Sequence, residues 1–201
     1  DSCPLLYDVL VTQQLGFEVN QCCLLPRAGE TIEGWRRQEA LLGTGENALV
    51  FAEIITPGPT TAGREGPFGP GFECMREQRR VAHTGKVMRL RVRGESLATI
   101  SDERSVFWGG LVEGQSLARL TQLRGKGAAI CWDAAGVKLA TLDGEGAVSV
   151  WQPGATEAPL ESAQGDSQFS DADFQGGDAP VIAAVTFDAQ LHLFDLRQGL
   201  A

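Results

Sequence analysis

A repeated pattern constrains this chain more than any other feature of its sequence. Four segments of alternating apolar residues, "ENALVF", "ERSVFW", "GAVSVW" and "QLHLF", each end on an aromatic residue and follow a short polar turn. Intervals of 57, 43 and 43 positions separate these closing aromatic residues, which are Phe51, Trp108, Trp151 and Phe194. Alternation with a period of two is typical of β-strands, and self-similarity at a fixed interval indicates a repeat architecture.

Further strand-like segments precede each closing strand. Small and apolar residues lie just before the polar turns, in "ALLGTG" (40–45), "SLATIS" (96–101), "KLATLD" (138–143) and "VIAAVT" (181–186). A third apolar segment precedes three of these, in "EVNQCCLL" (18–25), "KVMRLRV" (86–92) and "AAICWD" (128–133). Such units of several short strands predict the all-β fold of a WD-repeat β-propeller, in which each blade packs against its neighbours.

The repeat assigns structural roles to several side chains. We expect each closing aromatic residue to pack on the inner strands of the next blade. His83 precedes a first strand, where a histidine in WD repeats often bonds within its blade to the acid of the strand turn. Asp102, Asp188 and Asp195 are the acids expected to brace turns and strand ends.

Two segments do not follow the strand pattern. Residues 56–71 contain nine glycines and prolines among sixteen, a composition that does not pair into a sheet and predicts an inter-blade loop. Residues 152–178 are polar and predict a second loop that holds or replaces the outer strand of its blade.

Residues 1–201 are expected to form one propeller or partial propeller of about four blades, closing near 51, 108, 151 and 194. Ring propellers commonly have four to eight blades, so three arrangements are open. The chain forms a four-bladed ring, an incomplete ring finished by another chain, or a fragment of a six- to eight-bladed ring. We favour the fragment, because an open ring leaves a blade face and strand edges bare.

Charge and composition disfavour several classes of protein. The net charge of −9 argues against nucleic-acid binding, although residues 76–93 are strongly basic and residues 157–178 are acidic. No apolar run is long enough to span a membrane. Five cysteines with no C-x-x-C spacing indicate unpaired thiols in a reducing compartment.

No constellation of catalytic residues is visible, so we expect a protein that is not an enzyme. The two histidines are His83 and His192, and both positions favour structural roles. Clusters with metal-ligand spacing are absent, as are a dinucleotide fingerprint, a P-loop and a nucleophile elbow. The sequence therefore predicts no catalytic residue, no metal, no cofactor and no small-molecule substrate.

The chain resembles a family of WD-repeat nucleoporins. The resemblance lies in "YDVLVTQQ" (7–14), "ENALVFAEI" (46–54), "HTGKVMRL" (83–90) and "QLHLFDLRQG" (190–199), and is greatest to the forty-three-kilodalton type of the nuclear pore Y complex. This resemblance implies the N-terminal part of a seven-bladed ring. It also implies a non-catalytic scaffold that docks on other Y-complex nucleoporins at the nuclear envelope and supports protein and mRNA transport.

Two alternative functions remain open. The segment "VIAAVTFDAQLHLFDLR" (181–197) is also similar to that of substrate receptors of cullin-type ubiquitin ligases, where Arg197 would contact an adaptor propeller. A propeller subunit of an RNA-associated complex would use the basic residues 76–93, a role that the overall charge disfavours.

Overall fold

The computed structural model describes residues 15–25, 31–32, 35–57, 74–112, 116–125, 128–155, 157–175 and 180–200. Within these ranges all regular structure is β, with sixteen strands in four antiparallel sheets. The all-β propeller class predicted from the alternation is confirmed. In the same ranges no helix has the length and apolar character to cross a membrane.

The four sheets are consecutive along the chain, and we call them blades 1 to 4. Blade 1 contains β1 (Val19–Leu24), β2 (Thr31–Ile32), β3 (Trp35–Thr44), β4 (Ala48–Pro57) and β5 (Met75–Ala82). Blade 2 contains β6 (Val87–Arg93), β7 (Ser96–Ser101), β8 (Ser105–Gly110) and β9 (Ala118–Gln122). Blade 3 contains β10 (Ala128–Trp132), β11 (Leu139–Asp143), β12 (Ala147–Trp151) and β13 (Glu161–Gln164). Blade 4 contains β14 (Phe169–Phe174), β15 (Val181–Thr186) and β16 (Leu191–Asp195).

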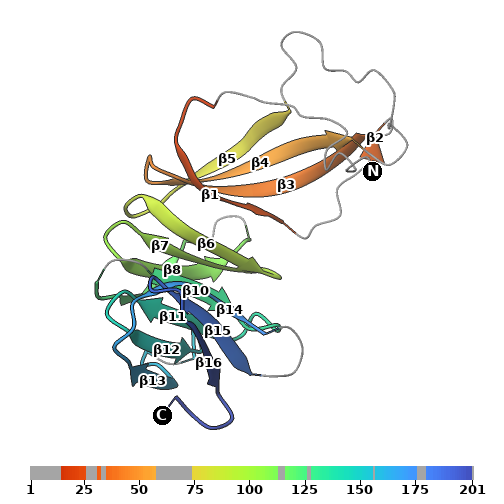
Figure 1. Cartoon of the computed structure of the whole chain (residues 1–201). Coiled ribbons are helices and arrows are strands. Elements are labelled where there is room, and N and C mark those ends of the chain that lie inside the picture. The colour runs from red at the N-terminus through yellow and green to blue at the C-terminus, as the bar shows by residue number, and fades with distance from the viewer. Residues whose placement is uncertain are drawn as a thin grey trace, which may run out of the picture.

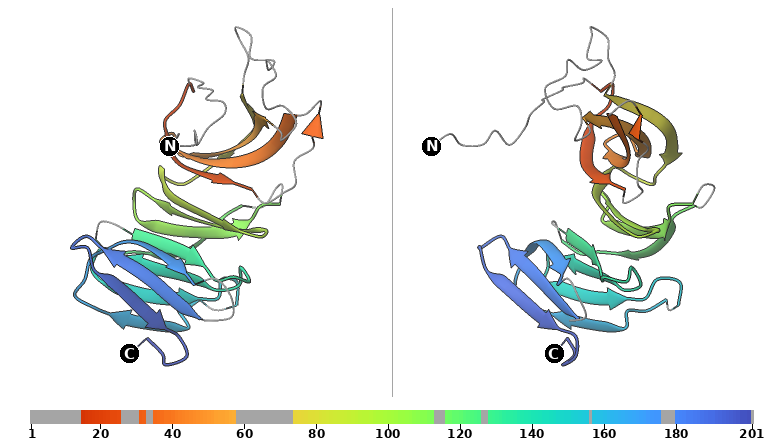
Figure 2. Two further views of the ribbon diagram at one scale, coloured as in Figure 1. Left: turned by 45° about the vertical axis from the view of Figure 1, so that its right-hand side comes forward. Right: turned by 90° about the vertical axis from the view of Figure 1, so that its right-hand side faces the viewer.

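Each blade is a meander in which successive strands pair as neighbours, apart from the short β2, which pairs at the side of β3. The first strands of the blades, β1, β6, β10 and β14, contact one another in order, which places them on the inner side of the arrangement. Figures 1 and 2 show the blades following one another in a curved row, with blade 1 and blade 4 at its opposite ends.

The structure contains strand residues in both of the segments that the sequence predicted to be loops. Within 56–71, Thr56 and Pro57 continue β4, and the remaining residues lie outside the described part of the chain. Residues 152–178 contain β13, which pairs with β12 as the outer strand of blade 3. The same segment contains β14, the inner strand of blade 4, so the prediction of a loop is wrong for Phe169–Phe174. Its alternating acids, Asp171 and Asp173, concealed this strand.

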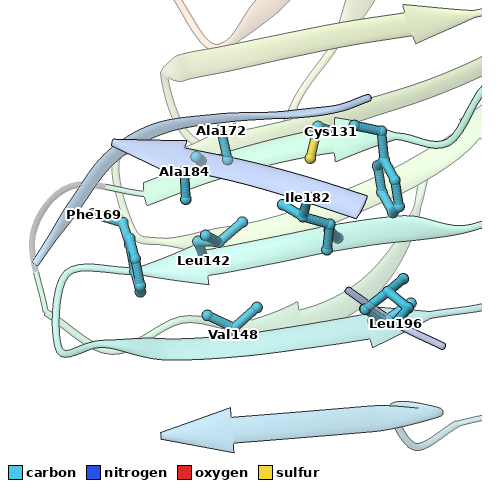
Figure 3. Close-up of a cluster of buried hydrophobic side chains, with 12 residues drawn as sticks. Cys131, Leu142, Val148, Phe169, Ala172, Ile182, Ala184 and Leu196 are labelled. Carbon is cyan, nitrogen blue, oxygen red and sulfur yellow. The ribbon is translucent and has the colours of Figure 1, made fainter. Parts of the chain in front are cut away.

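Most of the described core lies between the blades, and a smaller cluster of Leu42, Val50 and Ala52 lies within blade 1. Between blades 1 and 2 it includes Leu41, Leu49, Val87, Leu90 and Leu97. Between blades 2 and 3 it includes Ala98, Ile100, Val106, Ile130, Trp132, Leu139 and Trp151. Between blades 3 and 4 it includes Leu142, Val148, Phe169, Ala172, Ile182 and Ala184, which Figure 3 shows facing one another from the two sheets. Each interface thus buries apolar side chains that one isolated sheet would expose to water.

Candidate interaction surface

The hairpin between the second and third principal strands is bridged by a side-chain hydrogen bond in all four blades, although the direction of the bond differs. A buried polar residue ends the second strand, and we call it the cap residue of the blade; the four are Thr44, Ser101, Asp143 and Thr186. The cap side chain bonds to the residue four positions later. Thr44 donates to the carbonyl of Ala48 at 2.9 Å, whereas Ser101 and Asp143 accept from the amides of Ser105 and Ala147 at 3.2 and 2.8 Å. Thr186 accepts from the amide of Gln190 at 3.0 Å.

The residue three positions after each cap has a left-handed backbone. The φ angles are 56° at Asn47, 65° at Arg104, 89° at Gly146 and 63° at Ala189. This conformation costs free energy at a residue with a Cβ, and it costs less at asparagine than at arginine or alanine. The turn at 101–105 therefore keeps the geometry of the others although it lacks glycine.

His83 lies just before the inner strand β6 and forms hydrogen bonds within blade 2. Its Nδ1 is 3.0 Å from the carbonyl oxygen of Gly85, and its Nε2 is 2.8 Å from the hydroxyl of Thr99. Because a carbonyl only accepts, Nδ1 carries the proton and Nε2 accepts from Thr99. Burial lowers the pKa of His83, although the Gly85 carbonyl and Asp102 oppose this effect.

The expected bond between His83 and the turn acid is absent from these contacts. Asp102 instead accepts from the backbone amide of Lys86 at 2.9 Å, which ties the turn to the start of β6. Asp188, in the corresponding turn of blade 4, accepts from the cap hydroxyl of Thr186. Asp102 and Asp188 therefore both accept hydrogen bonds that stabilise their own turns.

The closing aromatic residues occupy two different positions of the repeat. Counted from the cap residues, Phe51 and Trp108 are at the seventh position, whereas Trp151 and Phe194 are at the eighth. Because successive side chains of a strand point to opposite faces, the two pairs face in opposite directions.

The contacts confirm this difference. Phe51 packs in the core toward blade 2, and a Cβ added to Gly154 of blade 3 would lie 2.9 Å from the ring of Trp108. Trp151 instead packs toward blade 2, and Phe194 toward blade 3, which are the preceding blades. The expectation that every closing aromatic packs on the next blade is therefore wrong for Trp151 and Phe194. Phe51 also does not close its strand, because β4 continues to Pro57.

The basic and acidic segments of the sequence meet on the inner side of the blades. Arg91 of β6 pairs with Asp171 of β14 at 3.1 Å, and Arg89 donates to the carbonyl of Ser170 at 3.4 Å. Other members of the basic segment also have partners within the chain. Arg79 lies 3.7 Å from the centre of the Phe51 ring, and Arg80 pairs with Glu46 at 2.9 Å. These arginines tie neighbouring strands together, whereas Arg76 and Lys86 of the same segment are exposed.

Arg197 follows β16 and is well exposed. Its side chain is 67% exposed and pairs with Asp195. The hydrogen bonds from Arg197 lower the pKa of Asp195 to about 2. Among the predicted site residues, Arg197 is therefore one that a partner protein could reach directly.

The described residues contain no group of three or more histidine, cysteine, aspartate or glutamate side chains positioned to hold a metal ion. The described cysteines are unpaired thiols, and burial raises the pKa of Cys131 to about 12. A thiol with such a pKa is a poor nucleophile at neutral pH.

His192 contacts Phe169 and Phe194 and lies 3.4 Å from the hydroxyl of Ser167, so it belongs to the packing of blade 4.

Within the part of the chain that the structure describes, one face of blade 4 is exposed. On blade 4 the side chains of Val185, Leu191 and Leu193 are 41%, 64% and 66% exposed and lie on the same face. We call these three residues, with Ala183 of the same face, the open face. The alternating segment "LHLF" already indicates that Leu191 and Leu193 lie on one face of the strand and that His192 lies on the other. The sequence alone does not reveal that the face is uncovered.

The comparisons with known proteins identify the fold class. A solved structure titled as the β-propeller domain of Cps50 (Swd1) from Myceliophteria thermophila superimposes with a TM-score of 0.57 at 12% sequence identity. The match covers 79% of this chain and 50% of that one, so the chain spans about half of the propeller it resembles. This likeness shows that the described residues have the fold of part of a β-propeller. No family model and no curated protein matches the sequence.

Proposed function

We propose that this protein is a non-catalytic scaffold that binds other proteins within a large assembly. The observation that carries this proposal is that the polar side chains form hydrogen bonds within the blades. Groups that could act in catalysis, such as His83 and Asp143, are held in the hydrogen bonds that shape the blades. An extended surface of stacked blades is left for contact with partners, and propellers commonly use such surfaces for binding.

The assembly that we propose is the Y complex of the nuclear pore, at the nuclear envelope. The support is the sequence resemblance at 46–54, 83–90 and 190–199, which fall on β4, on the loop and strand around β6, and on β16. The fourth resembling stretch, 7–14, lies outside the described residues. In this role the chain supports nucleocytoplasmic transport of protein and mRNA by holding other subunits in place.

Affinity purification of the full chain at low copy number tests this assignment. We expect Y-complex nucleoporins in a fixed ratio to the chain, together with fluorescence of a tagged form at the nuclear rim. Recovery of the chain without nucleoporins would contradict the assignment to the nuclear pore. Turnover of a substrate by the purified chain would contradict the broader scaffold proposal.

A ligase receptor is the second candidate, because Arg197 is exposed at the end of β16. In that case a cullin adaptor would copurify with the chain and would be lost on Arg197→Ala. Arg119→Ala is the matched control, because Arg119 is also exposed but lies on the outer strand β9. Retention of the adaptor by the Arg197→Ala variant would exclude this mode of binding.

An RNA-associated role has weaker support. It requires a free cationic surface, whereas Arg79, Arg80 and Arg91 contact groups of the chain itself. RNA binding that falls steeply with salt and that depends on Arg89, Arg91 and Arg93 would favour this role.

A further inference from the structure

One position of the repeat holds a ring in blades 2 and 4 but a small side chain in blade 3. It is the sixth position after the cap residue, and it pairs across the sheet with the second residue before the cap. Phe107 occupies this position in blade 2 and His192 in blade 4, whereas blade 3 has Ser149. All three side chains lie on the face toward the preceding blade, so the interface between blades 2 and 3 has no ring at this position.

In the two neighbouring interfaces the ring is part of the packing. Phe107 is 7% exposed and lies edge-on to His83, with 4.9 Å between the ring centres. His192 lies edge-on to Phe169 at 5.8 Å and stacks on Phe194 at 6.3 Å. Each of these rings fills space between two successive blades.

A cavity of about 440 Å³ lies where blade 3 has the small residue. Thr121 and Leu123 line it from blade 2, and Thr141, Ser149, Trp151 and Ser162 line it from blade 3. An apolar cavity of roughly 150 Å³ already holds one benzene ring. The space between blades 2 and 3 therefore has room for an aromatic side chain together with the groups beside it.

The lining of this cavity combines an aromatic surface with polar groups. The indole of Trp151 is held by its hydrogen bond to Thr141, and aromatic pairs pack favourably edge-on or with an offset. The hydroxyls of Ser149 and Ser162, which pair across β12 and β13, and the carboxylate of Asp143 also line the cavity. A ring that carries a polar group, as in tyrosine or histidine, matches both parts of the lining.

The strands that flank the cavity indicate an extended peptide as the occupant. Among the described residues, β9 is the outermost strand of blade 2 and β13 is the outermost strand of blade 3. The outer edge of such a strand leaves backbone N–H and C=O groups unpaired. An extended segment can pair with such an edge while one of its side chains enters the neighbouring pocket.

We propose that the cavity between blades 2 and 3 binds a partner protein through one tyrosine or histidine side chain of an extended segment. The ring takes the place beside Ser149 that Phe107 and His192 fill in the other interfaces, and it packs on Trp151. This binding mode rests on the proposed scaffold function, but it holds for any assembly that contains the chain.

Selection from a phage library of random linear peptides on the purified full chain tests the proposal. The variant Ser149→Phe places a ring in the cavity at the position of Phe107, and Val137→Phe is the matched control. Val137 belongs to the same blade but is 49% exposed in the β10–β11 turn. Fluorescence anisotropy with the selected peptides measures the Kd of each variant, and thermal unfolding compares their stability.

We expect the selected peptides to share a tyrosine or histidine whose replacement by alanine weakens binding about tenfold or more. Ser149→Phe should weaken binding by a similar factor, because its ring occupies the site, whereas Val137→Phe should change the Kd by less than about twofold. The Ser149→Phe chain should unfold within about 2 °C of the native chain, because the added ring enters existing space.

Three results would overturn the proposal. The first is a selection that yields no peptides, or peptides without a shared tyrosine or histidine. The second is unchanged peptide binding by the Ser149→Phe chain. The third is a large fall in its unfolding temperature, because the cavity would then not accommodate a ring. Copurification of nucleoporins does not depend on these results, so failure of this site and failure of the proposed function are distinguishable.

Discussion

The indole Nε1–H of Trp151 donates a hydrogen bond of 2.9 Å to the hydroxyl of Thr141, across two neighbouring strands of blade 3. Trp151 also packs in the core between blades 2 and 3, where it is 7% exposed. One side chain therefore joins the hydrogen bonding inside a blade to the packing between blades.

Removing this side chain should strongly destabilise the chain. We expect Trp151→Ala to lower the free energy of unfolding by about 3–5 kcal/mol, as for other large buried aromatic residues. Trp151→Phe should cost about 1–3 kcal/mol, because it leaves the Thr141 hydroxyl without its donor. Denaturant unfolding measures both changes, and Thr141→Val completes a double-mutant cycle. A cost below about 1 kcal/mol for Trp151→Ala would contradict the packing described.

The left-handed turn residues give a prediction of the opposite sign. Arg104→Gly and Ala189→Gly should each stabilise the chain by roughly 0.5–1 kcal/mol, because glycine adopts this backbone without steric cost. Gly146→Ala is the converse change, since its Cβ would lie 2.2 Å from the carbonyl oxygen of Gly165. It should destabilise by more than about 1 kcal/mol. Thermal unfolding of the three variants measures the effect, and a loss of stability in both glycine variants would contradict the turn geometry.

His83 should make stability depend on pH. Burial lowers its pKa in the folded state below the ordinary value of 6.5, so the unfolded chain binds the proton more readily. The contribution of His83 is complete above pH 6.5 and is lost progressively as the pH falls toward the lowered folded pKa. Unfolding measured from pH 5 to pH 8 should show this slope in the native chain and a smaller slope in His83→Gln. Equal slopes would mean that His83 is not buried as described.

The open face predicts a contrast between two matched variants. Leu191→Glu should change the free energy of unfolding of the isolated chain by no more than about 0.5 kcal/mol, because the side chain is exposed. Val148→Glu, at the equivalent position of blade 3, should cost more than about 3 kcal/mol, because it buries an unpaired charge. Chemical denaturation compares the two. Similar costs for both would show that the open face is covered in the isolated chain.

Much of the blade architecture was accessible from the sequence. The segments "SLATIS" and "VIAAVT" coincide with β7 and β15, because runs of apolar and β-branched residues favour strands. β7 is buried on both faces, whereas β15 is buried on alternate residues only. The inner strand β14 was missed because Asp171 and Asp173 give it the composition of a loop. The two acids point away from the interface that Phe169, Ala172 and Phe174 form. Apolar and polar residues therefore alternate in β14, but the acids give the segment the overall polarity of a loop.

The register of the closing aromatic residues was harder to predict. The interval of 43 between Trp108 and Trp151 equals that between Trp151 and Phe194, yet the cap residues of blades 2 and 3 are 42 positions apart. The equal spacing concealed a shift of one residue, and such a shift turns a side chain to the other face of its sheet. Only the contacts between blades reveal which face each aromatic residue occupies.

The central claim is that four sheets of one kind stand side by side around a common axis and serve as a surface for other proteins. A cryo-electron microscopy map of the native assembly that contains the chain tests it most directly. We expect residues 128–151 and 181–194 in adjacent blades that contact other proteins of the assembly. A map that places these segments apart, or that shows a helix in either, would contradict the account.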